Sequence, residues 1–308
     1  MKGFSGYLRL ILFVLICFVF QNINAQFSKT HYIPPIGTTG SGAASPQIQY
    51  LYISTPNEIP FNVTINPIGG TPETVQVSNA SPYEYYVGTG VDTNFIAQST
   101  LSGQNLSDKG YIIEAEDLVY VSVRLFTSSS YYQAGGIVSK GLAALGEEFR
   151  VGTFRNLGTL GSQQTQYLNF ISVLASQDNT TVNFSNFGNG VTLVNDAATS
   201  NILLNAGESY LISASPYTNS DNAEGLIGVL VESDKPIAVN SGSLTGSNSN
   251  LDSSPGGQDG GIDQIAPVER IGEEYIFVRG VGPDEIERPL IIAHEDNTEV
   301  YVNGALYA

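Results

Sequence analysis

The sequence predicts an all-β protein built from tandem repeats, and three observations support this fold class. First, residues 175–182 return as residues 293–300, an offset of 293 − 175 = 118, and residues 110–114 return as 228–232 at the same offset. Second, segments that alternate apolar and polar residues recur along the chain, as half-buried strands require. Third, 33 glycines and only 13% charged residues are typical of an all-β chain with many turns. A repeat of this kind is one supersecondary unit used again, with neighbours burying each other's apolar faces.

Residues 1–25 have the pattern of a signal peptide. Lys2 and Arg9 place positive charge before the apolar run 10–20, which is short for a membrane span, and Ala25 ends a small-residue cleavage site. We therefore expect a protein that is secreted, extracellular or on the outer cell surface, with a retained N-terminal anchor as the alternative. The chain after the signal peptide contains no segment that resembles a transmembrane helix.

The single cysteine, Cys17, lies inside the predicted signal peptide, so the mature chain has none. Exported eukaryotic domains of this size usually carry disulfides, and their absence favours a bacterial exported protein stabilised by burial alone. Residues 26–48 contain Pro34-Pro35 and a Gly- and Ser-rich stretch, and we expect them to form an extended linker.

The chain is strongly acidic. Twelve basic and 29 acidic residues give a net charge of −17, and removal of Lys2 and Arg9 leaves 10 − 29 = −19. Such a surface repels phosphate backbones, which argues against nucleic acid as a partner. It favours solubility and is compatible with divalent cations.

The first repeat unit is expected to span residues 49–166. Its first half holds four short alternating segments, which predict a four-stranded antiparallel meander. Its second half holds two strands, 111–114 and 118–125, with a tight turn at Glu116-Asp117 between them. The predicted meander strands are Tyr50–Ser54, Phe61–Ile65, Thr74–Val77 and Tyr83–Val87.

The second unit is expected to span residues 167–289. Its segment 177–179 is predicted to be a hairpin turn in which Asn179 adopts positive φ at low cost. Asp178 is expected to cap that turn by accepting backbone N–H groups. The segment 233–235 takes the place of the Glu116-Asp117 turn.

The spacing of a further motif indicates an insertion. Residues 272–275 resemble residues 146–149 at an offset of 272 − 146 = 126, which exceeds the repeat by 126 − 118 = 8 residues. We place the extra residues in the loop 246–261. Residues 290–308 would begin a third unit, and its first hairpin alone would leave an open sheet edge, so we expect the natural chain to continue beyond Ala308.

Two architectures fit these units. Each unit would hold roughly eight strands as two four-stranded meanders, which is the content of two propeller blades. A propeller-like arrangement is therefore the first expectation. Tandem β-sandwiches are the alternative, since seven or eight strands also make a sandwich.

Residues that could catalyse a reaction are scarce. The two histidines are His31 and His294, and His294 aligns with Ser176, so that position does not require imidazole. No nucleophile elbow, phosphate loop or zinc-binding helix motif is present. The recurring pairs Glu147-Glu148 and Glu273-Glu274 lie at repeat-equivalent places, which favours a structural role over that of a glycosidase pair. We expect no catalytic residues and no enzyme activity.

Calcium is the one cofactor that the sequence suggests. Asp252, Asp259 and Asp263 lie in or beside the inserted loop among several glycines, and carboxylate and carbonyl oxygens are the ligands that calcium prefers. Their spacing matches no EF-hand, so a polar loop without metal is the alternative.

Tyrosines cluster in or beside loops of the first unit. Exposed tyrosine is a good contact residue for sugars or proteins, whereas tyrosine that alternates on a strand is as often ordinary sheet packing. The clustered residues are Tyr83, Tyr85, Tyr86, Tyr131 and Tyr132.

Three segments together resemble a known family. Residues 233–242 (SDKPIAVNSG), followed by 263–267 (DQIAP) and 272–275 (GEEY), are similar to the IgGFc-binding protein N-terminal domain family. Residues 27–35 (FSKTHYIPP) look like the start of large surface proteins of Bacteroidetes, of the gliding-motility or secretion-sorted type. The resemblance implies an extracellular recognition module without catalytic residues. Animal members often carry a cysteine before the Gln-x-Pro stretch, which this chain lacks, and no residue here can be assigned Fc binding.

The sequence therefore predicts a non-enzymatic binding or adhesion module of a larger bacterial surface protein, with an extracellular glycan or protein as its ligand. A structural spacer domain is the second expectation. A carbohydrate-active enzyme is the third.

Overall fold

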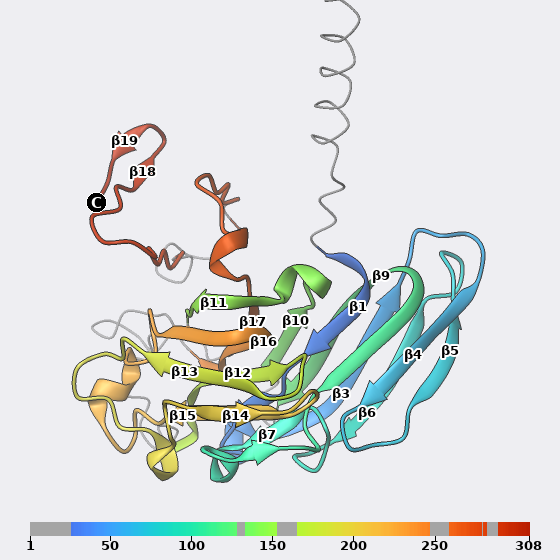
Figure 1. Ribbon diagram of the computed structural model, residues 1–308, viewed down its shortest axis with the longest axis horizontal. Coiled ribbons are helices and arrows are strands. Elements are labelled where there is room, and N and C mark those ends of the chain that lie inside the picture. Colours follow the sequence, from blue (N-terminus) through green and yellow to red (C-terminus); the bar gives the residue numbers. More distant parts are fainter. Residues whose placement is uncertain (1–25, 128–132, 153–164, 247–258, 279, 282–288) are drawn as a thin grey trace, which may run out of the picture.

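The computed structural model describes residues 26–127, 133–152, 165–246, 259–278, 280–281 and 289–308, and within them the chain is all-β (Figure 1). Fifteen strands form one sheet network, and two small sheets have two strands each. The all-β class is confirmed. The helical elements of the described residues are short 3-10 turns: η1 (Gly42–Ala44), η2 (Ser99–Leu101), η3 (Gly141–Ala144), η5 (Val194–Asp196), η6 (Ser220–Ala223) and η7 (Val268–Arg270).

One long strand, β9 (Tyr111–Thr127), organises the first half of the chain. The strands around it are β1 (Phe27–Ile33), β3 (Pro46–Ser54), β4 (Phe61–Pro67), β5 (Glu73–Val77), β6 (Tyr83–Thr89) and β10 (Gln133–Val138). Residues 111–115 of β9 lie between β4 and β1, and residues 122–127 lie between β3 and β10. β5 extends the first layer beside β4, and β6 extends the second beside β3.

β9 bends near residue 116 where it passes from one layer to the other. Asn62 donates its backbone N–H to Glu116 at 3.0 Å, and the Asn57 amide donates to Asp117 at 2.9 Å. Lys29, at the irregularity in the β1–β9 pairing, donates to the Glu116 carbonyl at 2.7 Å. The predicted tight turn at Glu116-Asp117 is therefore wrong. The two flanking segments are one continuous strand, because neighbours pair with both of them.

The second half has the same pairing pattern around β16 (Leu230–Gly246). Residues 230–232 lie between β13 and β11, and residues 239–242 lie between β12 and β17. β14 extends the layer of β13, and β15 extends the layer of β12. The strands are β11 (Gly146–Arg150), β12 (Asn169–Ala175), β13 (Thr180–Ser185), β14 (Ile202–Leu204), β15 (Ser209–Ala214) and β17 (Asp259–Ile265).

The segment 233–235, predicted as a turn, is also a bend inside one strand. Asp234 accepts the backbone N–H of Thr181 at 2.7 Å, and Lys235 donates to the Asn179 carbonyl at 3.0 Å. These side chains tie the bend to the adjacent loop. The turn prediction was wrong here because Ser-Asp-Lys-Pro is a local turn signature that non-local pairing overrides.

The predicted four-stranded meander is also wrong. β3 pairs with β6 and β9, whereas β4 pairs with β5 and β9. The β4–β5 hairpin is thus placed between β3 and β6 in sequence but joins the other layer. Because a propeller blade consists of consecutive paired strands, this pairing gives the propeller-like arrangement no support.

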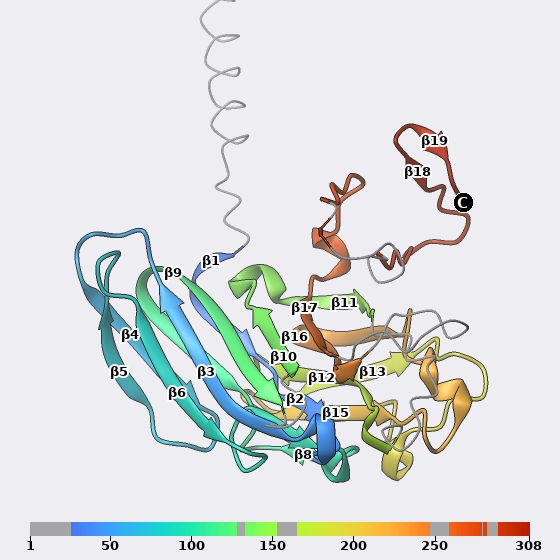
Figure 2. The same cartoon turned by 180° about the vertical axis from the view of Figure 1, so that it is seen from behind.

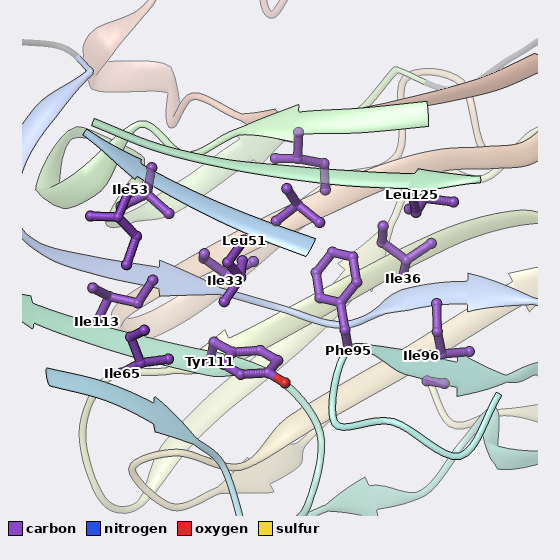
Figure 3. Packing of buried hydrophobic residues seen from close by; sticks show 14 of the residues in the cluster. Ile33, Ile36, Leu51, Ile53, Ile65, Phe95, Ile96, Tyr111, Ile113 and Leu125 are labelled. Carbon is purple, nitrogen blue, oxygen red and sulfur yellow. The ribbon is translucent and has the colours of Figure 1, made fainter. Parts of the chain in front are cut away.

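Each half has its own apolar core. Figure 3 shows the first, in which Ile33, Leu51, Ile65 and Ile113 of four different strands meet together with Ile53. The second core is equally well buried, and each large aliphatic side chain in either core contributes about 1.5–3 kcal/mol. It includes Phe149, Ile171, Val173, Val182, Ile212, Val231, Ile237 and Val239.

The halves meet along the outer face of β12, β15 and β16. From this face Phe170, Leu211 and Leu244 enter the core of the first half. Phe170 and Leu211 lie against Gly37 of β2 (Ile36–Thr38), which forms a small parallel sheet with β7 (Ile96–Gln98). β8 (Asn105–Leu106) adds a short strand beside β15. In Figure 1 the blue-to-green strands of the first half lie beside the yellow-to-orange strands of the second.

Residues 26–48 belong to the fold, so the predicted extended linker is wrong. They contribute β1, β2 and the first residues of β3. The Pro34-Pro35 pair lies buried between the halves, where Asn240 donates to the Pro34 carbonyl at 2.7 Å and Ser172 donates to the Pro35 carbonyl at 2.5 Å. The Pro-Pro pair favoured a linker because proline has no N–H to donate in a sheet. In the structure, side chains of the other half donate to its carbonyl groups instead.

The segment 177–179 has the predicted backbone but another role. Asn179 has φ of 54°, and Asn297, at the same place one repeat later, has φ of 60°. The strands on either side, β12 and β13, both pair with β16 but not with each other, so the segment connects two layers and does not close a hairpin. Asp178 accepts a backbone N–H from Ala206 at 3.0 Å, in a neighbouring loop rather than in its own turn.

Some sequence predictions concern residues outside the described ranges. These are the signal peptide, 1–25, and most of the inserted loop 246–261. Residues 290–308, predicted as the start of a third unit, hold the small hairpin β18 (Tyr301–Val302) and β19 (Ala305–Leu306), which pairs with no other described strand.

We predict that Gly37→Ala destabilises the contact between the halves. A Cβ atom at Gly37 would lie 2.6 Å from the Phe170 Cβ and 3.1 Å from the Leu211 Cδ1. Overpacking of this kind costs about 1–3 kcal/mol of unfolding free energy. Gly272→Ala is the control, because the nearest atom to its Cβ would be 3.8 Å away. Urea denaturation measures both, and equal unfolding free energies for the two variants would contradict the prediction.

Candidate binding surface

The outer face of β3, β6 and the C-terminal part of β9 carries a group of large side chains. Along β3, Leu51 and Ile53 point into the core and Tyr50 and Tyr52 point outward, as the period of two requires. The same alternation turns Phe126 of β9 outward. β3 and β6 run side by side in Figure 2. We call this surface the aromatic face; it consists of Ile48, Tyr50, Tyr52, Glu84, Tyr86, Arg124 and Phe126.

The aromatic face is open to solvent on the side away from the core. Exposed fractions are 42% for Ile48, 37% for Tyr52, 56% for Tyr86 and 53% for Phe126. Single exposed apolar residues are ordinary on protein surfaces, but several on adjacent strands form a patch. Such patches mark interaction sites.

The rings of this face contact one another. The ring centroids of Tyr50 and Tyr52 are 5.9 Å apart, and those of Tyr50 and Tyr86 are 5.6 Å apart. Burial and a side-chain hydrogen bond with Glu84 raise the pKa of Tyr52, and Arg124 opposes the rise. The Tyr52 hydroxyl is therefore neutral at physiological pH. Tyrosines packed in this way present apolar rings and polar tips with little freedom to lose on binding.

Gly136, a residue without a side chain, leaves space on this face for the side chain of Arg124. Gly136 of β10 pairs with Arg124 of β9, and a Cβ on Gly136 would lie 3.3 Å from the Arg124 Cδ. The aliphatic part of the Arg124 side chain thus lies against Gly136. Tyrosine together with arginine is the composition enriched at energetically dominant positions of protein interfaces.

The tyrosines singled out from sequence divide in two. Tyr86 is on the aromatic face, whereas Tyr83 and Tyr85 point to the other side of β6 and pack against the first core. Tyr131 and Tyr132 lie outside the described residues. Sequence reasoning missed Tyr50, Tyr52 and Phe126, although their alternation with buried residues was a usable signal.

Two of the three predicted calcium ligands have protein partners. Asp259 accepts the backbone N–H groups of Ala134 at 2.8 Å and Gly260 at 3.0 Å, and Asp263 forms an ion pair with Lys140 at 2.8 Å. Asp252 lies outside the described residues. In the described part of the chain, no three His, Cys, Asp or Glu side chains come together as a metal site would require. Calcium binding stays a prediction.

His31 is buried in a polar cluster between β1 and β10. Its Nε2 donates toward the carbonyls of Val119 at 3.1 Å and Ser28 at 3.3 Å, and its Nδ1 lies 3.0 Å from the Ser139 hydroxyl. Burial lowers the pKa of His31 from 6.5 to about 4, partly opposed by the two carbonyl groups. A neutral, fully buried imidazole with these partners holds strands together.

Gln264 joins the same cluster to the second half. Its amide nitrogen donates to the Tyr32 carbonyl at 2.7 Å, and its oxygen accepts the Lys140 N–H at 2.6 Å and lies 3.2 Å from the Ser139 hydroxyl. Gln264 belongs to the 263–267 segment that carries the family resemblance. That motif residue therefore has a structural role.

The carboxylates weighed as catalytic groups lie at the surface. Glu148 is 3.6 Å from the His294 Nε2, and Arg150 donates to the Nδ1 of the same ring at 3.3 Å, which ties β11 to the C-terminal segment. An open pocket elsewhere, beside η6, has Asp221 and Glu224 as its ionisable lining residues.

A sequence model of the family described as IgGFc binding protein matches residues 137–308, which is more than half of the chain. The chain belongs to the IgGFc binding protein family. The matched residues begin within β10 and include the bend of β16 and Gln264, so the resemblance carried by residues 233–242 and 263–275 is confirmed. The whole aromatic face, on β3, β6 and β9, precedes the matched residues.

The family match is not accompanied by a match to a protein of known function. No curated protein and no solved structure shows significant similarity to the chain. Among the described residues, no helix has the length and apolar character needed to cross a membrane.

We predict that His31 makes the fold sensitive to mild acid. Because the pKa of His31 is about 4 in the folded state and 6.5 in an unfolded chain, only the unfolded chain binds a proton between these values. Above pH 6.5 the ring is neutral in both states and does not affect the free energy of unfolding. As the pH falls from 6.5 to about 4, protonation of the unfolded chain lowers the free energy of unfolding progressively, by up to about 3 kcal/mol.

NMR titration of the His31 ring and urea unfolding between pH 7 and pH 5 test this prediction. His31→Asn is expected to flatten the pH dependence of stability in this range, whereas His294→Asn at the partly exposed histidine should preserve it. A His31 pKa near 6.5 in the folded protein would contradict the prediction.

Proposed function

We propose that the protein is a non-enzymatic, extracellular binding module whose ligand is another protein, and that the aromatic face is its contact surface. The observation that carries the proposal is the group of exposed Tyr and Phe rings around Arg124. Membership of a family named for binding supports it. The predicted signal peptide supports export.

The composition of the face favours a protein ligand over a nucleic acid. The chain carries a net charge of −17, and Arg124 on the face is accompanied by Glu84, so this face does not offer phosphates a basic surface. Ile48 and Phe126 add apolar area that a protein interface would bury. Adhesion to a cell or a matrix would be one use of such binding.

We further infer that the two halves are copies of one seven-stranded unit, arranged as tandem β-sandwiches. The support is the one-to-one correspondence between the partners of β9 and those of β16. In this interpretation the first unit begins at β1 rather than at residue 49, and the second at β11 rather than at residue 167. A spacer function would need the same tandem packing but no ligand.

The proposed contact surface predicts the effect of two substitutions. Tyr86→Ala and Phe126→Ala each remove an exposed ring and should weaken binding of a protein ligand by about tenfold or more. Because both side chains are more than half exposed, the unfolding free energy should change little. Leu203→Ala, at a position 54% exposed on β14, is the matched control and should bind as the wild type does.

The ligand would be sought on arrays of purified extracellular proteins, with immunoglobulin G Fc included, and in parallel on glycan arrays. Saturable binding of a protein that is weakened by both face variants supports the proposal. Absence of any reproducible ligand on either array would favour the spacer function and overturn it.

A further inference from the structure

The aromatic face of the first half has a counterpart in the second half. Tyr50 pairs with Arg124, and Phe170 pairs with Gly242, where 124 + 118 = 242. The second partner of Tyr50 is Tyr86 on β6, just as the second partner of Phe170 is on β15. The positions therefore correspond strand by strand.

The next outward position corresponds in the same way. Tyr52 pairs with Ser122, and Ser172 pairs with Asn240, where 122 + 118 = 240. Phe126 of the first half corresponds to Leu244 of the second by the same offset, 126 + 118 = 244. Tyr52 and Phe126 are exposed on the first half, and Ser172 and Leu244 at the same places are buried on the second, where this face forms the joint between the halves; Ser122 and Asn240 are buried in both.

The counterpart face holds an extended, proline-containing segment of the chain. Over residues 34–38 the backbone crosses the face, with Gly37 directly against Phe170. Asn240 and Ser172 donate to the carbonyls of Pro34 and Pro35. Proline offers carbonyl groups but no N–H, so the receiving face must supply side-chain donors and apolar rings.

The aromatic face supplies rings and a donor. Tyr52 and Ser122 stand at the places of Ser172 and Asn240, but the Tyr52 hydroxyl is bonded to Glu84 and Ser122 is buried. The donor is the guanidinium of Arg124, which is exposed at the position of Gly242. Tyr50 and Phe126 present rings, and aromatic surfaces of this kind receive proline-rich extended segments in peptide-binding domains.

We propose that the aromatic face binds an extended, proline-containing segment of another polypeptide, in the way that the second half holds residues 34–38. This inference rests on the proposed function and names the chemistry of its ligand. A second copy of the chain does not offer its own segment, because Pro34, Pro35 and Ile36 are buried in the joint. The occupant is therefore an accessible segment of a different protein.

The test uses the full chain and a synthetic heptapeptide with the sequence of residues 32–38, Tyr-Ile-Pro-Pro-Ile-Gly-Thr. The protein's own copy of this segment occupies the joint, so the added peptide has the aromatic face as its available site. Calorimetry should give saturable binding, and a peptide with both prolines replaced by alanine should bind at least about tenfold more weakly. Tyr50→Ala should reduce binding similarly, whereas Leu203→Ala should not.

The remaining outcomes separate this inference from the proposed function. Equal binding of the proline and alanine peptides would overturn it. Absence of peptide binding, with a protein ligand that is still lost in Tyr86→Ala, would overturn it and leave the proposed function standing. Self-association that depends on Tyr50 would replace the occupant with a second copy, and glycan binding lost in the same variant would overturn both proposals.

Discussion

The fold depends on two 17-residue strands that each belong to both layers of their half. Because β9 pairs on both sides along both of its parts, a one-residue shift of its register would turn its own core side chains outward and misalign its pairing with four neighbouring strands. The bend is where this arrangement is most vulnerable. There the ladder is interrupted, and Glu116 and Asp117 in β9, or Asp234 and Lys235 in β16, replace its bonds with side-chain contacts. The acidic and polar character of both bends follows from this requirement.

The same face of the sheet is buried in the second half and exposed in the first, and its side chains differ accordingly. Where it is buried in the joint, it carries Phe170, Leu211 and Leu244 with small polar residues that bind carbonyl groups. Where it is exposed, Tyr50 takes the place of Phe170, and Glu84 that of Leu211. A tyrosine offers the apolar area of its ring while its hydroxyl stays hydrated. An exposed face of tyrosines therefore remains more soluble in the absence of a partner than a face of aliphatic side chains.

Local patterns predicted what local physics decides. Alternation located β3, β4, β5, β6 and both parts of β9, although β1 and β10 were missed. The 118-residue offset aligned β9 with β16 in the correct frame. Partner choice could not be predicted in this way: β3 was expected beside β4 because neighbours in sequence usually pair, but β4 and β5 join the other layer. The exposure of Tyr50 could not be predicted from the sequence either, because it depends on whether another part of the chain covers β3. Pro34-Pro35 suggested a linker because the carbonyl-binding side chains lie about 140 to 210 residues away in sequence.

The motif that marks the family and the surface proposed for binding occupy different parts of the molecule. Residues 233–242 form the bend of β16 and the strand after it, and Gln264 holds β17 to β1 and to the residues after β10. Substitution there would disturb the pairing of several strands, so these residues are constrained by the fold whatever the ligand. The aromatic face carries no such constraint, because its outward side chains on β3 and β6 can change without altering the core beneath them. A family held together by the bend motif can therefore keep one architecture while each member recognises a partner of its own.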